Sequence, residues 1–342
     1  MLKDRISSMK CMQGMIHQYR MIKIPEYAQW HEDFFQCHAM FKFQQFGELH
    51  RDKNIYYMKF DDPTWGFFAS WKFGLVGLSS AERYGFTPVI DWTDRSPYFE
   101  PGGVNGIQNP FEYYFNPVSD VTTEEAGKSY NVSLYNNHNR GTLDTGYDAD
   151  AMLNEYVRLN SKYIHIRDDV YKEIRCEIAE LLNGKQTIGI HVRGVEWGNI
   201  RSHPIPVGLE EYSSKADEAI KKYGFQQIFL ATDSEDTVSF FRERYKDTVI
   251  LYPNTIRTKK GGKTLAIFGG GEKRPQSRYA LGYEVLRDML TLSFCDGLIA
   301  GYSNVRFAAE VYKLGRNETY LYRHLIKQEI NKTGITVQKA FM

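Results

Sequence analysis

The residues best suited to chemistry lie between positions 187 and 196. This stretch begins as a short apolar, β-branched run, which is typical of a buried strand. It then places His191, Arg193 and Glu196 where the strand should end. The carboxyl ends of the strands form the ligand crevice of an open parallel sheet, and charged groups are rarely buried without partners. We therefore expect Arg193 to hold a nucleotide diphosphate, with a sugar presented beside it.

Asp288 is a carboxylate on the apolar stripe of a predicted helix, on the same side as Leu281 and Leu292. A buried carboxylate needs partners. One candidate partner is guanine, whose ring N–H and exocyclic amine are adjacent donors that an acceptor-only carboxylate can bind together. The alternative is a salt bridge with Arg278 or Arg287, and the residues alone do not decide between the two.

Ser303 and Asn304 follow an apolar run at 297–300 and precede a helical pattern. A hydroxyl and free backbone N–H groups at a helix start can bind phosphate. Ser and Asn are also ordinary helix caps, so both roles stay open.

Asp148 and Asp150 form a D-x-D pair, which binds metal in one large class of nucleotide-sugar enzymes when it follows a strand. Here the pair precedes a helical pattern that starts near Met152. Acidic residues at a helix N-terminus cap it and favour its dipole. Capping is therefore the favoured interpretation, and no metal site is predicted.

The elements that must position these residues alternate through the C-terminal half. Apolar runs predict strands at 187–193, 227–233, 249–252 and 297–300, and helical periodicity predicts helices at about 209–222 and 281–295 and after positions 234 and 304. Alternating short strands and helices indicate a doubly wound parallel sheet. A basic, glycine-rich loop at 253–279 lacks the Walker pattern, so we interpret it as a flexible insertion or a lid, the insertion being favoured.

The pattern of the N-terminal half also predicts an α/β fold. A strand at 55–60, a helix that opens at about 65 and stops at Gly85, and a strand at 86–92 form one strand-helix-strand unit. Gly74 and Gly77 are costly inside a helix, so they predict its close approach to a neighbour. Residues 93–147 are irregular, and the segment 109–115 within them is a candidate acceptor site.

Length and composition bound the class of protein. A chain of 342 residues predicts two domains, 1–183 and 184–342, divided at Asn183-Gly184. A net charge of +1 argues against nucleic acid as a partner. Four scattered cysteines and no apolar run of membrane-spanning length indicate a reducing, cytoplasmic setting. The basic N-terminus could touch an anionic membrane face, although an arm packed on the body is favoured.

Several motifs in order resemble a known family. They are HVRGVE at 191–196, ATD at 231–233, and Asp288 followed by LSFCD at 292–296 and by Ser303. Together they are similar to the three-motif core of the fucosyltransferase superfamily, which includes the α1,6-fucosyltransferases, the bacterial nodulation fucosyltransferases and the protein O-fucosyltransferases. WGFF at 65–68, PVIDW at 88–92 and the segment 109–115 look like bacterial members, so the resemblance covers about residues 55 to 325.

The resemblance implies a GT-B fold, in which two Rossmann-like domains with parallel sheets face a central cleft and the C-terminal one binds the donor. It implies an inverting, metal-independent glycosyltransferase without a cofactor, which moves fucose from GDP-fucose to a hydroxyl of a glycan or glycoconjugate acceptor, as in polysaccharide biosynthesis. Residue by residue, it implies guanine recognition by His191 and Asp288 and β-phosphate binding by Arg193. Asp233, Ser303 and Tyr212 would line the same site.

Glu196 is the candidate general base. The family commonly has Thr-Asp where this chain has Val195-Glu196. This difference keeps two alternatives open: an enzyme that uses another GDP-sugar, and a non-catalytic nucleotide- or sugar-binding protein on the same fold. The acceptor stays open among a surface polysaccharide precursor, a lipid-linked glycan and a protein side chain.

Overall fold

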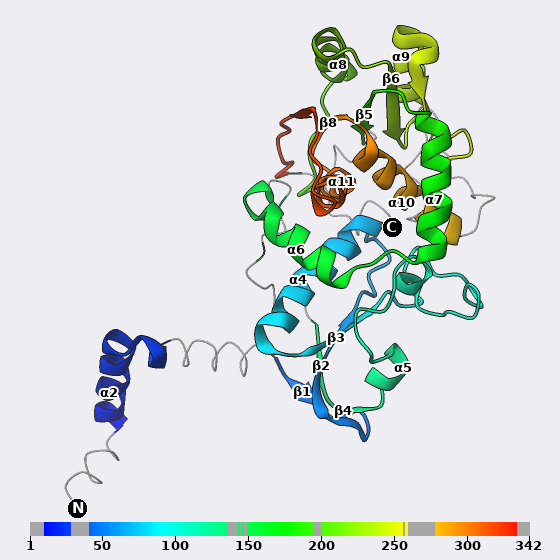
Figure 1. Ribbon diagram of the computed structural model, residues 1–342. Helices are drawn as coiled ribbons and strands as arrows, with labels where there is room; N and C mark the ends of the chain where they lie inside the picture. The colour runs from blue at the N-terminus through cyan, green and yellow to red at the C-terminus, as the bar shows by residue number, and fades with distance from the viewer. Residues whose placement is uncertain are drawn as a thin grey trace, which may run out of the picture.

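The computed structural model describes residues 10–28, 41–135, 143, 146, 149–193, 200–255, 257–258 and 278–333. Within them the chain forms two sheets with helices packed around them (Figure 1). This arrangement confirms the predicted α/β class with two sheets. Asp148, Glu196 and most of the loop 253–279 lie outside the described residues, so the structure does not address their predicted roles.

The N-terminal sheet has the strand order β1-β4-β2-β3. Strand β2 pairs in parallel with β3 and β4, whereas β1 pairs antiparallel with β4. The strands are β1 (Phe43–Gln44), β2 (Leu49–Lys59), β3 (Thr87–Asp91) and β4 (Ser129–Leu134). Helix α4 (Phe67–Tyr84) connects β2 to β3, as the predicted strand-helix-strand unit requires. A Cβ atom on Gly77 would lie 2.2 Å from the sulfur of Met58, which confirms the predicted close approach of this helix to a strand.

The C-terminal sheet is parallel throughout and has the order β7-β6-β5-β8-β9. Its strands are β5 (Thr187–Val192), β6 (Gln227–Thr232), β7 (Val249–Ile250), β8 (Gly297–Ala300) and β9 (Tyr322–Leu325). Every residue of β5 is buried, because β5 is the central strand and helices cover both faces. A central strand buried on both faces needs the continuous apolar run seen in the sequence.

The remaining helices are α2 (Lys10–Lys23), α5 (Thr123–Ala126), α6 (Leu153–Tyr163), α7 (Asp168–Leu182), α8 (Leu209–Tyr223), α9 (Glu235–Tyr245), α10 (Arg278–Phe294) and α11 (Asn304–Gly315), with short 3-10 turns η1 (Pro110–Tyr113), η2 (Ala149–Met152) and η4 (Lys246–Thr248). Of these helices, α8, α9, α10 and α11 lie close to the predicted positions. Helix α7 ends at Asn183, whose left-handed φ of 47° stops the helix. The domain division proposed at this point stays a prediction.

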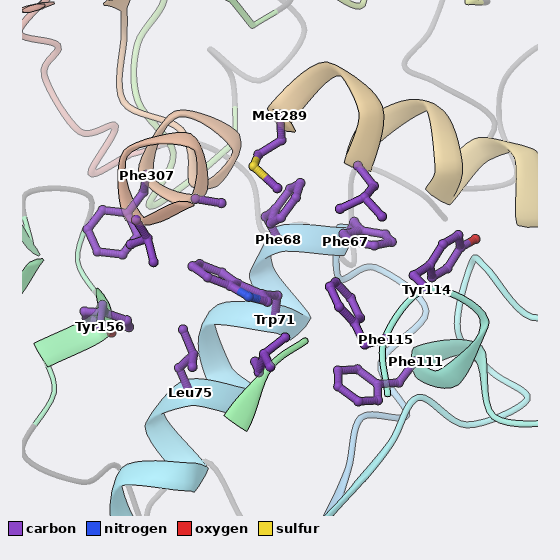
Figure 2. Packing of buried hydrophobic residues seen from close by; sticks show 14 of the residues in the cluster. Phe67, Phe68, Trp71, Leu75, Phe111, Tyr114, Phe115, Tyr156, Met289 and Phe307 are labelled. Carbon is purple, nitrogen blue, oxygen red and sulfur yellow. The ribbon is translucent and has the colours of Figure 1, made fainter. Parts of the chain in front are cut away.

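One aromatic core joins the two halves of the chain. Phe67, Phe68 and Trp71 of α4 pack in the same cluster as Met289 of α10 and Phe307 of α11 (Figure 2). Aromatic side chains of this size bury about 150–250 Å² each. The helices that carry the C-terminal site are therefore held against the N-terminal sheet by apolar burial.

The segment 109–115 belongs to this core. Phe111, Tyr114 and Phe115 are buried, and Figure 2 shows them beside the start of α4. The ring of Tyr114 stacks on Tyr279 at 5.3 Å, and its hydroxyl donates to the Tyr279 carbonyl at 2.8 Å. The hypothesis of an acceptor site here is therefore wrong for these side chains, since they are buried in the core and Tyr114 contacts the N-terminal end of α10.

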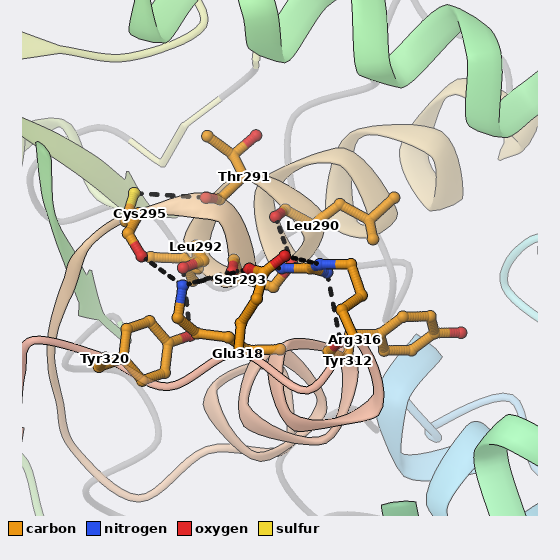
Figure 3. Close-up of polar contacts among 10 residues, drawn as sticks. Leu290, Thr291, Leu292, Ser293, Cys295, Tyr312, Arg316, Glu318 and Tyr320 are labelled. Carbon is orange, nitrogen blue, oxygen red and sulfur yellow. Dashed lines mark hydrogen bonds and ion pairs between the residues drawn. The ribbon is translucent and has the colours of Figure 1, made fainter. Parts of the chain in front are cut away.

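Basic side chains fix the C-terminal end of α10 and the start of β8 (Figure 3). The Lys313 ammonium donates to the carbonyls of Cys295 at 2.9 Å and Ser293 at 3.3 Å. Arg316 adds a bond to the Ser293 carbonyl at 2.7 Å. Cations satisfy the free carbonyls of a helix C-terminus and complement its dipole, so the helix that carries Asp288 is held at both ends.

Helix α2 stands apart from the body in Figure 1. Met15, Tyr19 and Ile22 share one face of it, and they are 71%, 64% and 76% exposed. The favoured prediction, an arm packed on the body, is therefore wrong for this helix. Among the described helices, none is long and apolar enough to cross a membrane.

Candidate nucleotide site

The site is built at the carboxyl edge of the C-terminal sheet. Val192 of β5 pairs with Thr232 of β6, so Arg193 and Asp233 leave adjacent strands at matching positions. On the other side of β5, His191 pairs with Ala300 of β8, three residues before Ser303. The sheet register thus brings together four predicted residues that are distant in sequence.

His191 uses both of its ring nitrogens. Its Nδ1 lies 3.2 Å from the carbonyl oxygen of Ala231 and its Nε2 lies 2.9 Å from the Oγ of Ser303. A carbonyl can only accept, so Nδ1 carries the proton and Nε2 accepts from the hydroxyl. Burial, and then the charge of Arg193, lowers the pKa of His191 to about 4. The ring is therefore neutral at physiological pH, and it positions Ser303.

Ser303 is the N-cap of α11. Its Oγ accepts from the backbone N–H groups of Val305 at 3.0 Å and Arg306 at 3.3 Å while its proton points to His191. The predicted helix start at Ser303 and Asn304 is confirmed. Their role in binding phosphate stays a prediction, which the positive end of the α11 dipole favours.

Arg193 is half-buried directly after β5. Its charge acts on two imidazoles, because it contributes to lowering the pKa of both His191 and His203. The backbone carbonyl of Asp233, directly after β6, accepts from the N–H of Thr258 at 2.8 Å. A guanidinium at this edge can bind two phosphate oxygens with its fork of N–H groups.

Tyr212 lies on α8, and its hydroxyl lies next to Gly301 in the turn between β8 and α11. Its side chain is buried, and a Cβ atom on Gly301 would lie 2.6 Å from its hydroxyl. Only glycine therefore permits this close approach. Burial, strengthened by the charge of Glu211, raises the pKa of Tyr212, so its phenol is neutral. Its place in the nucleotide site stays a prediction.

Asp288 is half-buried on α10. Within the described part of the chain it makes no ion pair, because Arg287 instead contacts Glu177 at 2.7 Å. The salt-bridge interpretation with Arg278 or Arg287 is therefore wrong. Burial raises the pKa of Asp288 to about 7, against the opposing charges of Arg287 and Arg257. No described residue pairs with this carboxylate, so it can bind a ligand that offers donors.

Asp150 lies in the first turn of η2, and its carboxylate pairs with arginines that are distant in sequence. Its carboxylate contacts Arg306 at 3.1 Å and Arg323 at 2.6 Å, and Glu310 binds the same two arginines at 2.7 and 2.5 Å. Asp148, which precedes η2, lies outside the described residues, so the capping interpretation stays a prediction. These ion pairs could not be predicted from the sequence, because the arginines lie on α11 and β9, more than 150 positions away.

Two further residues beside the site were not assigned by sequence. His203 lies near Arg193, and the backbone around it is tied to Asn331 by bonds of 2.8 and 2.9 Å. Arg257 lies near Asp288. Neither belongs to a recognisable motif, and only the fold reveals their positions.

Metal-ligating groups and surface hollows were the other features that could mark a site. No group of three metal-ligating side chains occurs within the described ranges. A surface hollow of about 410 Å³ lies between α8 and α9, lined by Glu210, Ser213, Ser214, Asp217, Glu218, Lys221 and Arg244. None of these is a predicted site residue.

Comparisons with known proteins give structural similarity only. No protein-family model matches the chain, and no curated protein matches it in sequence. A NodZ α1,6-fucosyltransferase soaked with GDP-fucose is 18% identical, with a TM-score of 0.43, and the match covers 76% of this chain and 92% of that one. POFUT1 in complex with GDP-fucose is 12% identical, with a TM-score of 0.46 and coverages of 83% and 100%.

A mutant of Arabidopsis thaliana FUT1 in complex with GDP is 10% identical, with a TM-score of 0.39 and coverages of 87% and 75%. The chain is thus similar to solved structures of fucosyltransferases. All three TM-scores lie below 0.5.

Proposed function

We propose that the protein is an inverting, metal-independent glycosyltransferase that moves fucose from GDP-fucose to a hydroxyl of a glycan acceptor. One observation carries the proposal. Arg193, Asp233 and the N-terminus of α11 meet at the carboxyl edge of a parallel sheet. Asp288, a carboxylate with no ion-pair partner among the described residues, lies on the neighbouring α10. Cationic and N–H donors suit a diphosphate, and the carboxylate suits guanine.

Arg193 is the group that stabilises the leaving diphosphate. In a single displacement the acceptor oxygen bonds to the anomeric carbon while the bond from that carbon to the β-phosphate oxygen breaks. The electron pair stays on GDP and the hydroxyl proton goes to a general base. Negative charge therefore grows on the β-phosphate, where a fixed guanidinium is most effective. Glu196 is the proposed base, and it lies outside the described residues.

GDP-fucose is the donor to test first, because the similar structures include GDP-fucose and GDP complexes. The test is a panel of GDP-fucose, GDP-mannose, UDP-glucose and ADP-glucose, read by thermal shift and by release of the nucleotide diphosphate. Stabilisation and release with GDP-fucose alone support the proposal. Release with GDP-mannose alone would support another GDP-sugar, and binding without release would support a non-catalytic protein.

We also propose that α2 places the protein at the anionic cytoplasmic face of a membrane. Its exposed face of Met15, Tyr19 and Ile22 is flanked by Arg20 and Lys23 in the last turn. Helices with one apolar face and basic flanks lie in the headgroup region of anionic bilayers. The charge of these flanks favours a lipid surface over a second copy of the same basic helix.

A further inference from the structure

Arg257 is a buried cation with an unused donor. Its side chain is 9% exposed. Its two terminal nitrogens donate to the carbonyls of Thr255 at 3.0 Å and Tyr252 at 3.2 Å. Its Nε–H has no partner among the described residues. A buried unsatisfied donor costs about 1–3 kcal/mol, so its retention calls for a functional explanation.

The backbone places Arg257 at the carboxyl edge of the sheet. The next residue, Thr258, bridges to Ser234 directly beyond β6. Its N–H donates to the Asp233 carbonyl at 2.8 Å and its carbonyl accepts from Glu235 at 3.0 Å. Arg257 is therefore held beside the end of β6, on the same edge as the proposed nucleotide site.

Arg257 is linked to the helix that carries Asp288. It donates to the carbonyl of Tyr252, whose hydroxyl lies 2.9 Å from the Oγ1 of Thr291, one turn after Asp288 on α10. The groups that act on Asp288 are Arg287, Arg257, Glu284 and Glu177. Arg287 is neutralised by its ion pair with Glu177 and stacks on the Tyr252 ring at 3.8 Å.

Arg257 makes no ion pair within the described ranges. Of the carboxylates that act on its charge, Asp288 is the strongest, ahead of Glu235 and Glu284. The two charges, neither of which has an ion-pair partner among the described residues, therefore lie close enough to interact.

This pair of groups matches one complete edge of guanine. That edge carries an oxo acceptor at position 6, then a ring N–H, then an exocyclic amine. A carboxylate binds the last two, and a guanidinium donates to the first. Adenine carries an amine donor at position 6 and a bare ring nitrogen, so it offers the wrong partner to both groups.

We propose that Arg257 is a specificity-determining residue that donates to the 6-oxo group of the guanine base bound by Asp288. The inference rests on the proposed function, since it assigns the base-reading partner of the same site. Arg257 would select guanine nucleotides over adenine nucleotides, whichever sugar the donor carries.

The test compares the affinities of GDP, IDP and ADP for wild type and Arg257→Met by calorimetry. IDP keeps the 6-oxo group and the ring N–H and lacks only the amine. Arg257→Met should weaken GDP and IDP by the same factor, at least about tenfold for a charged hydrogen bond, and leave ADP unchanged. Asp288→Asn should weaken GDP more than IDP. Arg242→Met, an exposed arginine on α9, should change nothing.

Unchanged GDP-over-ADP selectivity in Arg257→Met would overturn the inference, as would an equal loss for all three nucleotides. If that variant does not fold, 6-thio-GDP on wild type decides: its sulfur is a poor acceptor, so it should bind at least about tenfold more weakly than GDP, and equal affinity overturns the inference. Wild type that binds no GDP contradicts the proposed function itself, which is a distinguishable result.

Discussion

The Nε2 of His191 lies 2.9 Å from the Oγ of Ser303. One hydrogen bond therefore joins the central strand β5 to the N-terminus of α11. The same hydroxyl caps the helix through two backbone N–H groups, so it satisfies three partners at once. The helix end proposed to face the phosphates is thereby fixed relative to Arg193.

Ser303→Ala should lower the free energy of unfolding by about 2 kcal/mol or more, because it removes a cap worth about 1 kcal/mol and leaves a buried imidazole nitrogen unpaired. Ser234→Ala is the matched control. Ser234 caps α9 through one bond at 3.4 Å, so its loss should cost about 1 kcal/mol or less. Urea unfolding measures both, and equal losses would contradict the linking role of Ser303.

Asp288 should make nucleoside binding depend on pH. Its pKa is raised to about 7 by burial, and only the ionised form accepts both guanine donors. Guanosine affinity should therefore rise about tenfold from pH 6 to pH 8, as the ionised fraction increases. Guanosine is used because it carries no phosphate that titrates in this range. Asp288→Asn should give a flat profile, and a flat wild-type profile would contradict the assignment.

The raised pKa of Asp288 should also make the stability of the ligand-free protein fall as pH rises. A carboxyl group with a raised pKa holds its proton longer in the folded state than in the unfolded state. The free energy of unfolding of wild type, relative to that of Asp288→Asn, should therefore fall as pH rises from about 4 to about 7. Chemical unfolding at several pH values measures this difference.

Glu310→Gln tests the buried ion-pair network that joins residue 150 to α11. Glu310 is 2% exposed and Arg306 is 1% exposed, so removing one carboxylate leaves buried positive charge undercompensated. The free energy of unfolding should fall by about 3–5 kcal/mol. Glu124→Gln breaks the exposed pair with Lys128 and should cost about 1 kcal/mol or less. Similar losses in the two variants would show that the buried network stabilises the fold no more than an exposed ion pair does.

The proposed membrane contact predicts co-sedimentation with vesicles that contain phosphatidylglycerol and weaker binding to phosphatidylcholine vesicles. The double variant Tyr19→Ser, Ile22→Ser should lose this binding. Leu321→Ser, which removes another half-exposed apolar side chain outside α2, should keep it. The proposal would be contradicted if the double variant still bound the vesicles. It would also be contradicted if the wild-type protein self-associated and did not bind vesicles.

The sequence predicted what local patterns encode. The strands at 187–192, 227–232 and 297–300 and the helix start at Ser303 follow from apolar runs and capping chemistry, and the structure confirms them. The register that brings Arg193, Asp233 and Ser303 to one edge follows from the rule that parallel strands share their carboxyl ends.

The errors concern pairings between distant segments. The ion pairs of Asp150 were not predicted, because its arginine partners on α11 and β9 have no local signature. Arg287 was a candidate partner of Asp288, but Glu177 of α7 binds it instead. The segment 109–115 was predicted as a functional site because long irregular loops often carry function, but its aromatic side chains lie in the core. Such choices depend on tertiary packing, which a pattern along the chain does not contain.

The most direct test compares the affinities of GDP and guanosine for wild type and Arg193→Ala. If Arg193 binds the diphosphate, the variant should lose between about tenfold and about a hundredfold in GDP affinity, the range for a hydrogen bond to a charged group. Guanosine affinity should stay unchanged, because the base site is intact. Wild-type GDP affinity in Arg193→Ala, or an equal loss for GDP and guanosine, would contradict the account.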